Sequence, residues 1–117
     1  DAIDGQRPAT TSPKVIRDVI RGEMGFDGLL MSDDVSMNAL SGPISSRAKS
    51  ALFAGCDIVL HCNGSMEEMR EVAEEGKVLE GPALKRAEAA HAHLSAPGAF
   101  DAAAAETRLT ELLGAVA

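Results

Sequence analysis

The sequence predicts an α/β fold whose strands run parallel. Two short apolar runs, residues 29–31 and 58–60, have the length and composition of buried strands. Helical patterns precede, separate and follow them, and this alternation is typical of βα units. The chain has 117 residues, of which 45% are hydrophobic, so it is at most one domain and can bury a core.

The first helix is expected after a loop over residues 1–11. Ser12 is a good N-cap, and Pro13 suits the first helical position because its missing N–H needs no partner there. Gly25 can end the helix, since glycine readily adopts the left-handed conformation that follows a last turn. The apolar stripe of this helix consists of Val15, Ile16, Val19, Ile20 and Met24.

The first strand is uninterrupted in its apolar character, which favours a strand covered on both faces. It is cut off abruptly by a hydroxyl and two carboxylates, those of Ser32, Asp33 and Asp34. The later elements follow from similar signals of capping, periodicity and glycine. They are a loop at 38–43, a helix capped by Ser45 or Ser46 and ended by Gly55, a strand at 57–61, a helix at 66–75 capped by Ser65, a helix at 82–94, and a helix at 102–113 capped by Asp101.

A sheet of only two strands would leave these apolar strands without enough neighbours. Two parallel strands cannot protect both edges of a sheet, yet both runs have the composition of strands with neighbours and cover. We therefore expect residues 1–117 to form a single partial domain. A missing N-terminal part, or other copies in a homo-oligomer, would cover the exposed strand edges.

Composition excludes several classes of partner. A formal net charge of −7 without a basic patch argues against nucleic-acid binding. No apolar run approaches the roughly 20 residues of a membrane span, so no membrane contact is expected. Cys56 and Cys62 are separated by a strand's length, beyond disulfide reach, and we expect both to be free, mostly buried thiols. Free thiols fit a reducing, cytoplasmic setting.

The acids at the end of the first strand are open to several interpretations. Taken alone, such residues most often form turns or accept backbone N–H groups. The end of a parallel strand is also where catalytic groups are presented. Adjacent carboxylates could bind Mg²⁺, but the further oxygen ligands of such a site are not evident, so no metal is expected. Met37 and His61 are weak candidates for lining a pocket, with packing as the simpler interpretation.

Several ordered motifs over residues 4–63 give the chain a family resemblance. Together they are similar to family 3 glycoside hydrolases, and most closely to bacterial β-N-acetylhexosaminidases of peptidoglycan recycling. The segments are Arg7-Pro8-Ala9-Thr10-Thr11-Ser12-Pro13, Gly25-Phe26-Asp27-Gly28, Met31-Ser32-Asp33-Asp34-Val35-Ser36-Met37, Ala54-Gly55-Cys56-Asp57 and Leu60-His61-Cys62-Asn63.

The resemblance implies that the chain is the C-terminal part of a TIM-type (β/α)8 barrel, followed by a helical tail. Residues 1–65 would hold the last βα units with the nucleophile loop, and residues 66–117 the C-terminal helices. Asp33 matches the family's catalytic nucleophile, at the strand end where barrel enzymes place such groups. Asp34 would orient the loop.

The implied activity is retaining hydrolysis that releases terminal N-acetylglucosamine from peptidoglycan-derived sugars, with no cofactor. The acid/base His of this branch lies in a Lys-His-Phe-Pro-Gly-His-Gly-like motif, which is absent here. We do not transfer that role to His61, His91 or His93, and most sugar-binding residues also belong to earlier strands. The alternative is a non-catalytic fragment or a self-assembling α/β interaction module.

Overall fold

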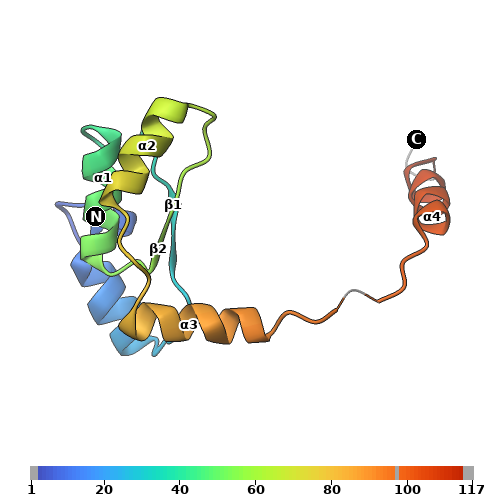
Figure 1. Cartoon of the computed structure of the whole chain (residues 1–117), viewed down its shortest axis with the longest axis horizontal. Coiled ribbons are helices and arrows are strands. Elements are labelled where there is room, and N and C mark those ends of the chain that lie inside the picture. The colour runs from blue at the N-terminus through green and yellow to red at the C-terminus, as the bar shows by residue number, and fades with distance from the viewer. Residues whose placement is uncertain (1–2, 97, 115–117) are drawn as a thin grey trace.

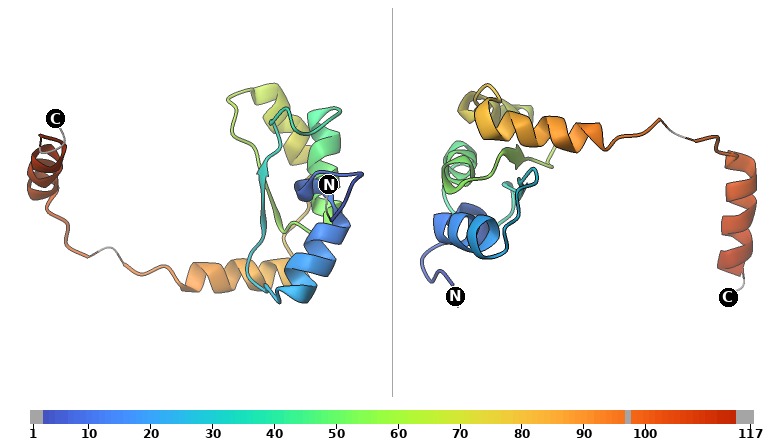
Figure 2. Two further views of the ribbon diagram at one scale, coloured as in Figure 1. Left: turned by 180° about the vertical axis from the view of Figure 1, so that it is seen from behind. Right: turned by 90° about the horizontal axis from the view of Figure 1, so that it is seen from below.

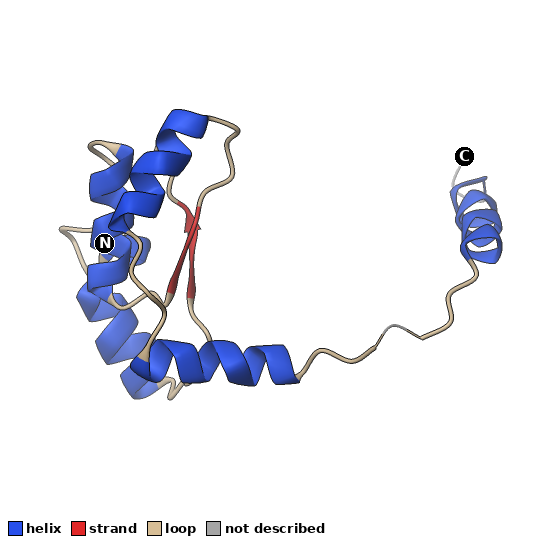
Figure 3. Cartoon of the chain, in the orientation of Figure 1, coloured by secondary structure: helices blue, strands red, loops and turns tan. Residues whose placement is uncertain are grey.

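The computed structural model describes residues 3–96 and 98–114 and confirms an α/β arrangement with two parallel strands. Helices and strands alternate as far as α2, and two further helices follow (Figures 1 and 3). In the described residues no helix is long and apolar enough to cross a membrane. The elements are η1 (Ala9–Thr11), η2 (Lys14–Glu23), β1 (Met31–Asp34), α1 (Ile44–Ala54), β2 (Ile58–Leu60), α2 (Met66–Glu75), α3 (Gly81–Ala92) and α4 (Ala102–Gly114).

The helices that pack on the sheet lie along one of its faces, and the opposite face is open (Figures 1 and 2). Two small groups of apolar side chains fill the space between the helices and the strands. Burial of these side chains is the main force that holds the layers together. One group is Ile16, Ala51, Ala54 and Cys56, and the other is Val35, Leu40 and Ile44.

The expectation that the first strand is covered on both faces is wrong for this chain. Strand β1 begins at Met31 and includes the two acids, so it lies two residues further along than the apolar run predicted. Its faces differ, because Ser32 is buried under the helices whereas Met31 is 53% exposed. The apolar run indicated a strand that needs apolar neighbours on both faces. Within the described residues, however, no helix or strand packs on the open face.

Most of the predicted helix ends are confirmed. The Ser12 hydroxyl accepts the Val15 N–H at 3.1 Å, which makes it the cap of η2. The winding of η2 is that of a π-helix, with the Met24 N–H bonded to the Val19 carbonyl five residues back at 2.8 Å. Ser65 caps α2, and the Asp101 carboxylate accepts the Ala104 N–H at 3.0 Å.

The predicted caps of α1 are wrong. The helix starts at Ile44 after Pro43, so Ser45 and Ser46 lie inside its first turn and no side chain caps it. Ile44 is buried with Val35 and Leu40, and this apolar contact brings it into the first turn. The expectation for the cysteines is half right, because both are free and Cys56 is buried, whereas Cys62 lies exposed beyond the end of β2.

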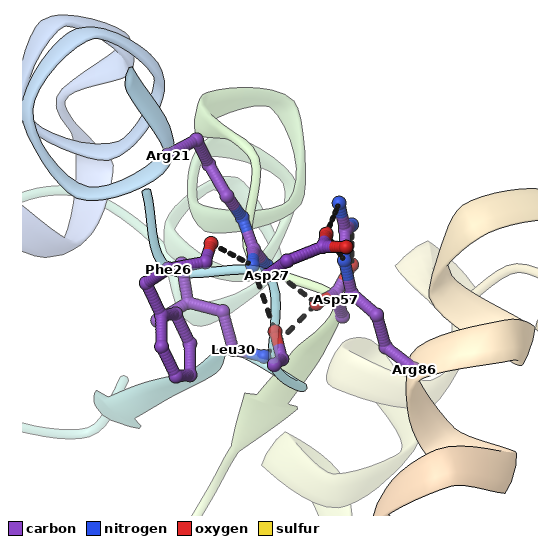
Figure 4. Close-up of polar contacts among 7 residues, drawn as sticks. Arg21, Phe26, Asp27, Leu30, Asp57 and Arg86 are labelled. Atoms are coloured by element: carbon purple, nitrogen blue, oxygen red, sulfur yellow. Dashed lines mark hydrogen bonds and ion pairs between the residues drawn. The ribbon is translucent and has the colours of Figure 1, made fainter. Parts of the chain in front are cut away.

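A buried carboxylate joins the starts of the strands to α3 (Figure 4). The Asp57 side chain is 6% exposed and accepts the Leu30 N–H at 2.9 Å. It pairs with Arg21 of η2 at 2.8 Å and with Arg86 of α3 at 3.1 Å. Arg86 also reaches Asp27 at 2.9 Å. Because α3 buries no residue, these ion pairs are central to its attachment.

Helix α4 stands apart from the other described helices and strands (Figure 1). The radius of gyration is accordingly 19.0 Å, against about 13 Å for a compact domain of about 100 residues. The predicted apolar side of this helix exists, but its side chains are exposed. They are Leu109, Leu112 and Leu113.

Candidate active site at the end of strand β1

The register between the two strands contains one extra residue on β1. Met31 pairs with Ile58 and Asp34 pairs with Leu60, so three steps along β1 match two steps along β2. Such an insertion is a β-bulge, which bends the strand and redirects its side chains. The bulge lies at Ser32 and Asp33, directly before the loop that leaves the sheet.

The bulge explains how two adjacent acids can stand between two buried residues. Ser32 is 5% exposed and Val35 is 0% exposed, and both face the helices. Their separation of three is odd, whereas residues on one face of a regular strand are separated by even numbers. The extra residue of the bulge shifts the alternation of side chains by one, so both residues can be buried. Asp33 and Asp34 are thereby kept out of the core.

The two carboxylates have different surroundings. Asp33 is exposed, and one of its oxygens accepts the Asp34 N–H at 2.8 Å. Asp34 lies at the rim and accepts the N–H groups of Ser36 at 2.9 Å and Cys62 at 3.1 Å, as well as the Ser36 hydroxyl. Asp34 therefore ties together the two loops that follow β1 and β2, while Asp33 is oriented but accessible.

These bonds also affect the ionisation of Asp34. The Ser36 hydroxyl and then the Ser36 N–H hold the pKa of the Asp34 carboxyl below its ordinary value; burial opposes them, and the Cys62 N–H adds a smaller lowering. Hydrogen bonds donated to a carboxylate favour its charged form. Asp34 is thus an anion throughout the neutral range, suited to holding backbone amides.

Arg47 of α1 holds the loop after β1 by hydrogen bonds. Its guanidinium donates to the carbonyls of Gly42 at 2.8 Å, Val35 at 3.2 Å and Met37 at 3.2 Å. Met37, at 44% exposure, remains available at the surface of this loop. The loop is consequently fixed by its buried Val35 and by the guanidinium.

His61 is turned away from the open face. Its side chain is 6% exposed, and its Nε2 lies 2.9 Å from the Glu68 carboxylate of α2. Asn63 donates to the same carboxylate. The bonds from His61 and Asn63 hold the pKa of Glu68 below its ordinary value. The His61 Nδ1 atom is buried without a hydrogen-bond partner among the described residues. His61 therefore anchors the loop after β2.

The hollow beside Asp33 is smaller than a usual ligand pocket. Its volume is about 160 Å³, and it is lined by residues of η1, η2 and β1, whereas ligand pockets usually span about 300 to 1,000 Å³. His91 and His93 lie at the exposed end of α3. In the described ranges no group of three or more His, Cys, Asp or Glu side chains is placed to hold a metal ion.

Sequence reasoning identified the acids but missed the residues that position them. Ser32, Ser36 and Arg47 received no role, although one signal was available in the sequence. A hydroxyl at the end of an apolar run is unusual for a buried position. The odd spacing between Ser32 and Val35 indicates a bulge only once the structure shows both to be buried.

Comparison with known proteins places the chain among glycoside hydrolases. The pattern of the glycosyl hydrolase family 3 N-terminal domain matches residues 1–92. A beta-hexosaminidase of Stenotrophomonas maltophilia (strain K279a) is 40% identical over 79 residues, which is 66% of this chain and 24% of that protein. A beta-hexosaminidase of Alkalilimnicola ehrlichii is 50% identical over 58 residues, 48% of this chain and 17% of that protein. The chain thus spans a quarter or less of these curated relatives.

Solved structures resemble the fold. The glycoside hydrolase family 3 beta-N-acetylglucosaminidase from Paenibacillus sp. str. FPU-7 matches with a TM-score of 0.69 and 24% identity, over 86% of this chain and 22% of that one. Zn-bound CbsA from Thermotoga neapolitana matches with a TM-score of 0.62 and 26% identity, over 82% of this chain and 24% of that one. At this identity the first match concerns the fold alone.

Proposed function

Because the chain belongs to glycoside hydrolase family 3, we propose that it forms the C-terminal part of the TIM-type barrel of a retaining β-N-acetylhexosaminidase, with Asp33 as nucleophile. The observation that carries the proposal is the contrast between the two acids. Asp34 is occupied by three donors, whereas Asp33 is exposed near the end of β1, and barrel enzymes place their catalytic groups at such strand ends.

The chemistry assigns one covalent bond to Asp33. A carboxylate oxygen attacks the anomeric carbon as the bond to the leaving oxygen breaks, and an acid protonates that oxygen. Water then attacks the same carbon, the ester bond breaks, and a base takes the proton of the water. No histidine of the described residues is placed for this acid/base role, so we propose that it comes from outside these 117 residues.

The substrate class follows from the relatives rather than from the site. The curated relatives are beta-hexosaminidases. We propose that terminal N-acetylglucosamine on peptidoglycan-derived sugars is removed, and that the protein works in the cytoplasm, where the free thiols of Cys56 and Cys62 would stay reduced.

The test replaces Asp33 by Ala in the full natural protein that contains this chain. Turnover of an aryl N-acetyl-β-glucosaminide should fall at least about a thousandfold, because the covalent step loses its nucleophile. Azide, which fits the vacated space, should restore release of the aryl group and yield the α-glycosyl azide. Asp34→Ala is the matched control and should show no azide rescue. Retention of more than about a tenth of wild-type turnover by Asp33→Ala would refute the assignment.

A second candidate is a self-assembling interaction module. The open sheet face and the small hollow beside Asp33 favour it, because two unprotected parallel strands invite pairing with another chain. Size measurement of residues 1–117 in solution, beside the same activity assay, distinguishes the two. A stable oligomer, with no activity either in residues 1–117 or in the full natural protein, would support the interaction module. Activity of the full natural protein would contradict it.

A further inference from the structure

The hydroxyl of Ser32 links the bulge at Ser32 and Asp33 to strand β2. It accepts the Leu60 N–H at 3.0 Å and donates to the Asp33 carbonyl at 2.7 Å. A hydroxyl can do both at once, which an aliphatic side chain of the same size cannot. The ladder resumes at Val35, whose N–H donates to the Leu60 carbonyl at 2.9 Å.

We propose that Ser32 is a positioning residue that fixes the direction of the Asp33 side chain by holding the bulge in place. The inference rests on the proposed function, since it concerns the aim of the nucleophile. The bond to the Asp33 carbonyl restrains the peptide unit between Asp33 and Asp34. The bond from Leu60 anchors that restraint to β2, the strand that lies beside it.

Burial strengthens this restraint. Ser32 is almost inaccessible, so water cannot replace its hydroxyl when it is removed. The Leu60 N–H would then lose this partner inside the sheet, and a buried amide without a partner is costly. A change of register or a twist of the bulge can recover a partner, and either would turn Asp33 away from its direction in the present structure.

Ser12 offers a matched control within the same chain. It is also a buried serine whose hydroxyl both donates, to Asp4, and accepts, from the Val15 N–H. It lies at the start of η2 and makes no hydrogen bond to β1 among the described residues. Loss of its hydroxyl reports the cost of removing a buried serine hydroxyl without disturbing the bulge.

The experiment measures the first turnover of an aryl N-acetyl-β-glucosaminide by the full natural protein and its variants, per folded molecule. Ser32→Ala should slow formation of the glycosyl-enzyme by about thirtyfold, because a small misplacement of a reacting group has effects of this order. KM should change less than about threefold, since the binding contacts are not on Ser32. Ser32→Thr, which keeps the hydroxyl, should recover most of the rate.

Each outcome decides a different point. Equal first-turnover rates for Ser32→Ala and Ser12→Ala would overturn the positioning role while leaving the nucleophile in place. If Ser32→Ala does not fold, Ser32→Cys keeps the volume but only a weak hydrogen-bonding group, and a wild-type rate in it would likewise overturn the role. Absence of activity in the wild-type protein would refute the proposed function itself.

Discussion

Replacement of Asp57 by Ala should destabilise the chain more than any surface substitution, because three groups depend on its carboxylate (Figure 4). The Leu30 N–H and two guanidinium groups lose a partner at 2.8 to 3.1 Å. Removing one member of a buried ion pair costs about 3–5 kcal/mol. Arg21 keeps the carbonyls of Phe26 and Gly28, and Arg86 keeps Asp27, so we expect about 3 kcal/mol, the lower end.

The assay is urea unfolding of residues 1–117 followed by circular dichroism at neutral pH. With a urea dependence of about 1–3 kcal/mol per molar, the midpoint should fall by about 1 to 3 M. Asp27→Ala is the matched control, because Asp27 pairs with the same Arg86 but its side chain is 88% exposed. That pair should contribute about 0–1 kcal/mol. Equal losses for the two variants would refute the argument that burial makes Asp57 important.

Two further predictions concern the ionisation of Asp34 and the glycine that ends α1. The pKa of Asp34 is lowered in the folded state, so its contribution to stability is present above its ordinary value of 3.8 and is lost as pH falls through the folded-state pKa. The difference in urea midpoint between wild type and Asp34→Asn should therefore shrink at acidic pH, and a difference that grows there would contradict the assignment. Gly55 ends α1 at φ 121°, where a Cβ would lie 2.9 Å from Ile16 Cγ2. Gly55→Ala should cost about 1–3 kcal/mol, whereas Gly64→Ala, which meets nothing within 4 Å, should change the unfolding midpoint little.

The local signals of the chain predicted its elements well where one residue decides the outcome. Ser12, Ser65 and Asp101 cap helices as expected, because each needs only a backbone N–H two or three residues away. Gly55 ends its helix because a positive φ suits glycine. Ser45 and Ser46 failed as caps because the burial of Ile44 outweighed their local preference.

The site shows the limit of that reasoning. The position of Asp33 after an apolar run, within a series of family motifs, was sufficient to select it as the candidate nucleophile. The bond that ties Asp34 to the loop after β2 was not evident, because its donor, the Cys62 N–H, lies 28 residues away in the sequence. The role of Ser32 depends equally on Leu60, which is also 28 residues away.

By itself the sequence determined the alternation of helices and strands, most helix ends and the family to which residues 1–92 belong. These features depend on periodicity and on contacts within a turn of the chain. Only the tertiary structure decided that β1 carries a bulge, that one face of the sheet is open, and that Asp57 joins η2 to α3. The strand register and the ion pairs of Asp57 depend on partners 26 or more residues apart, so no local pattern can specify them.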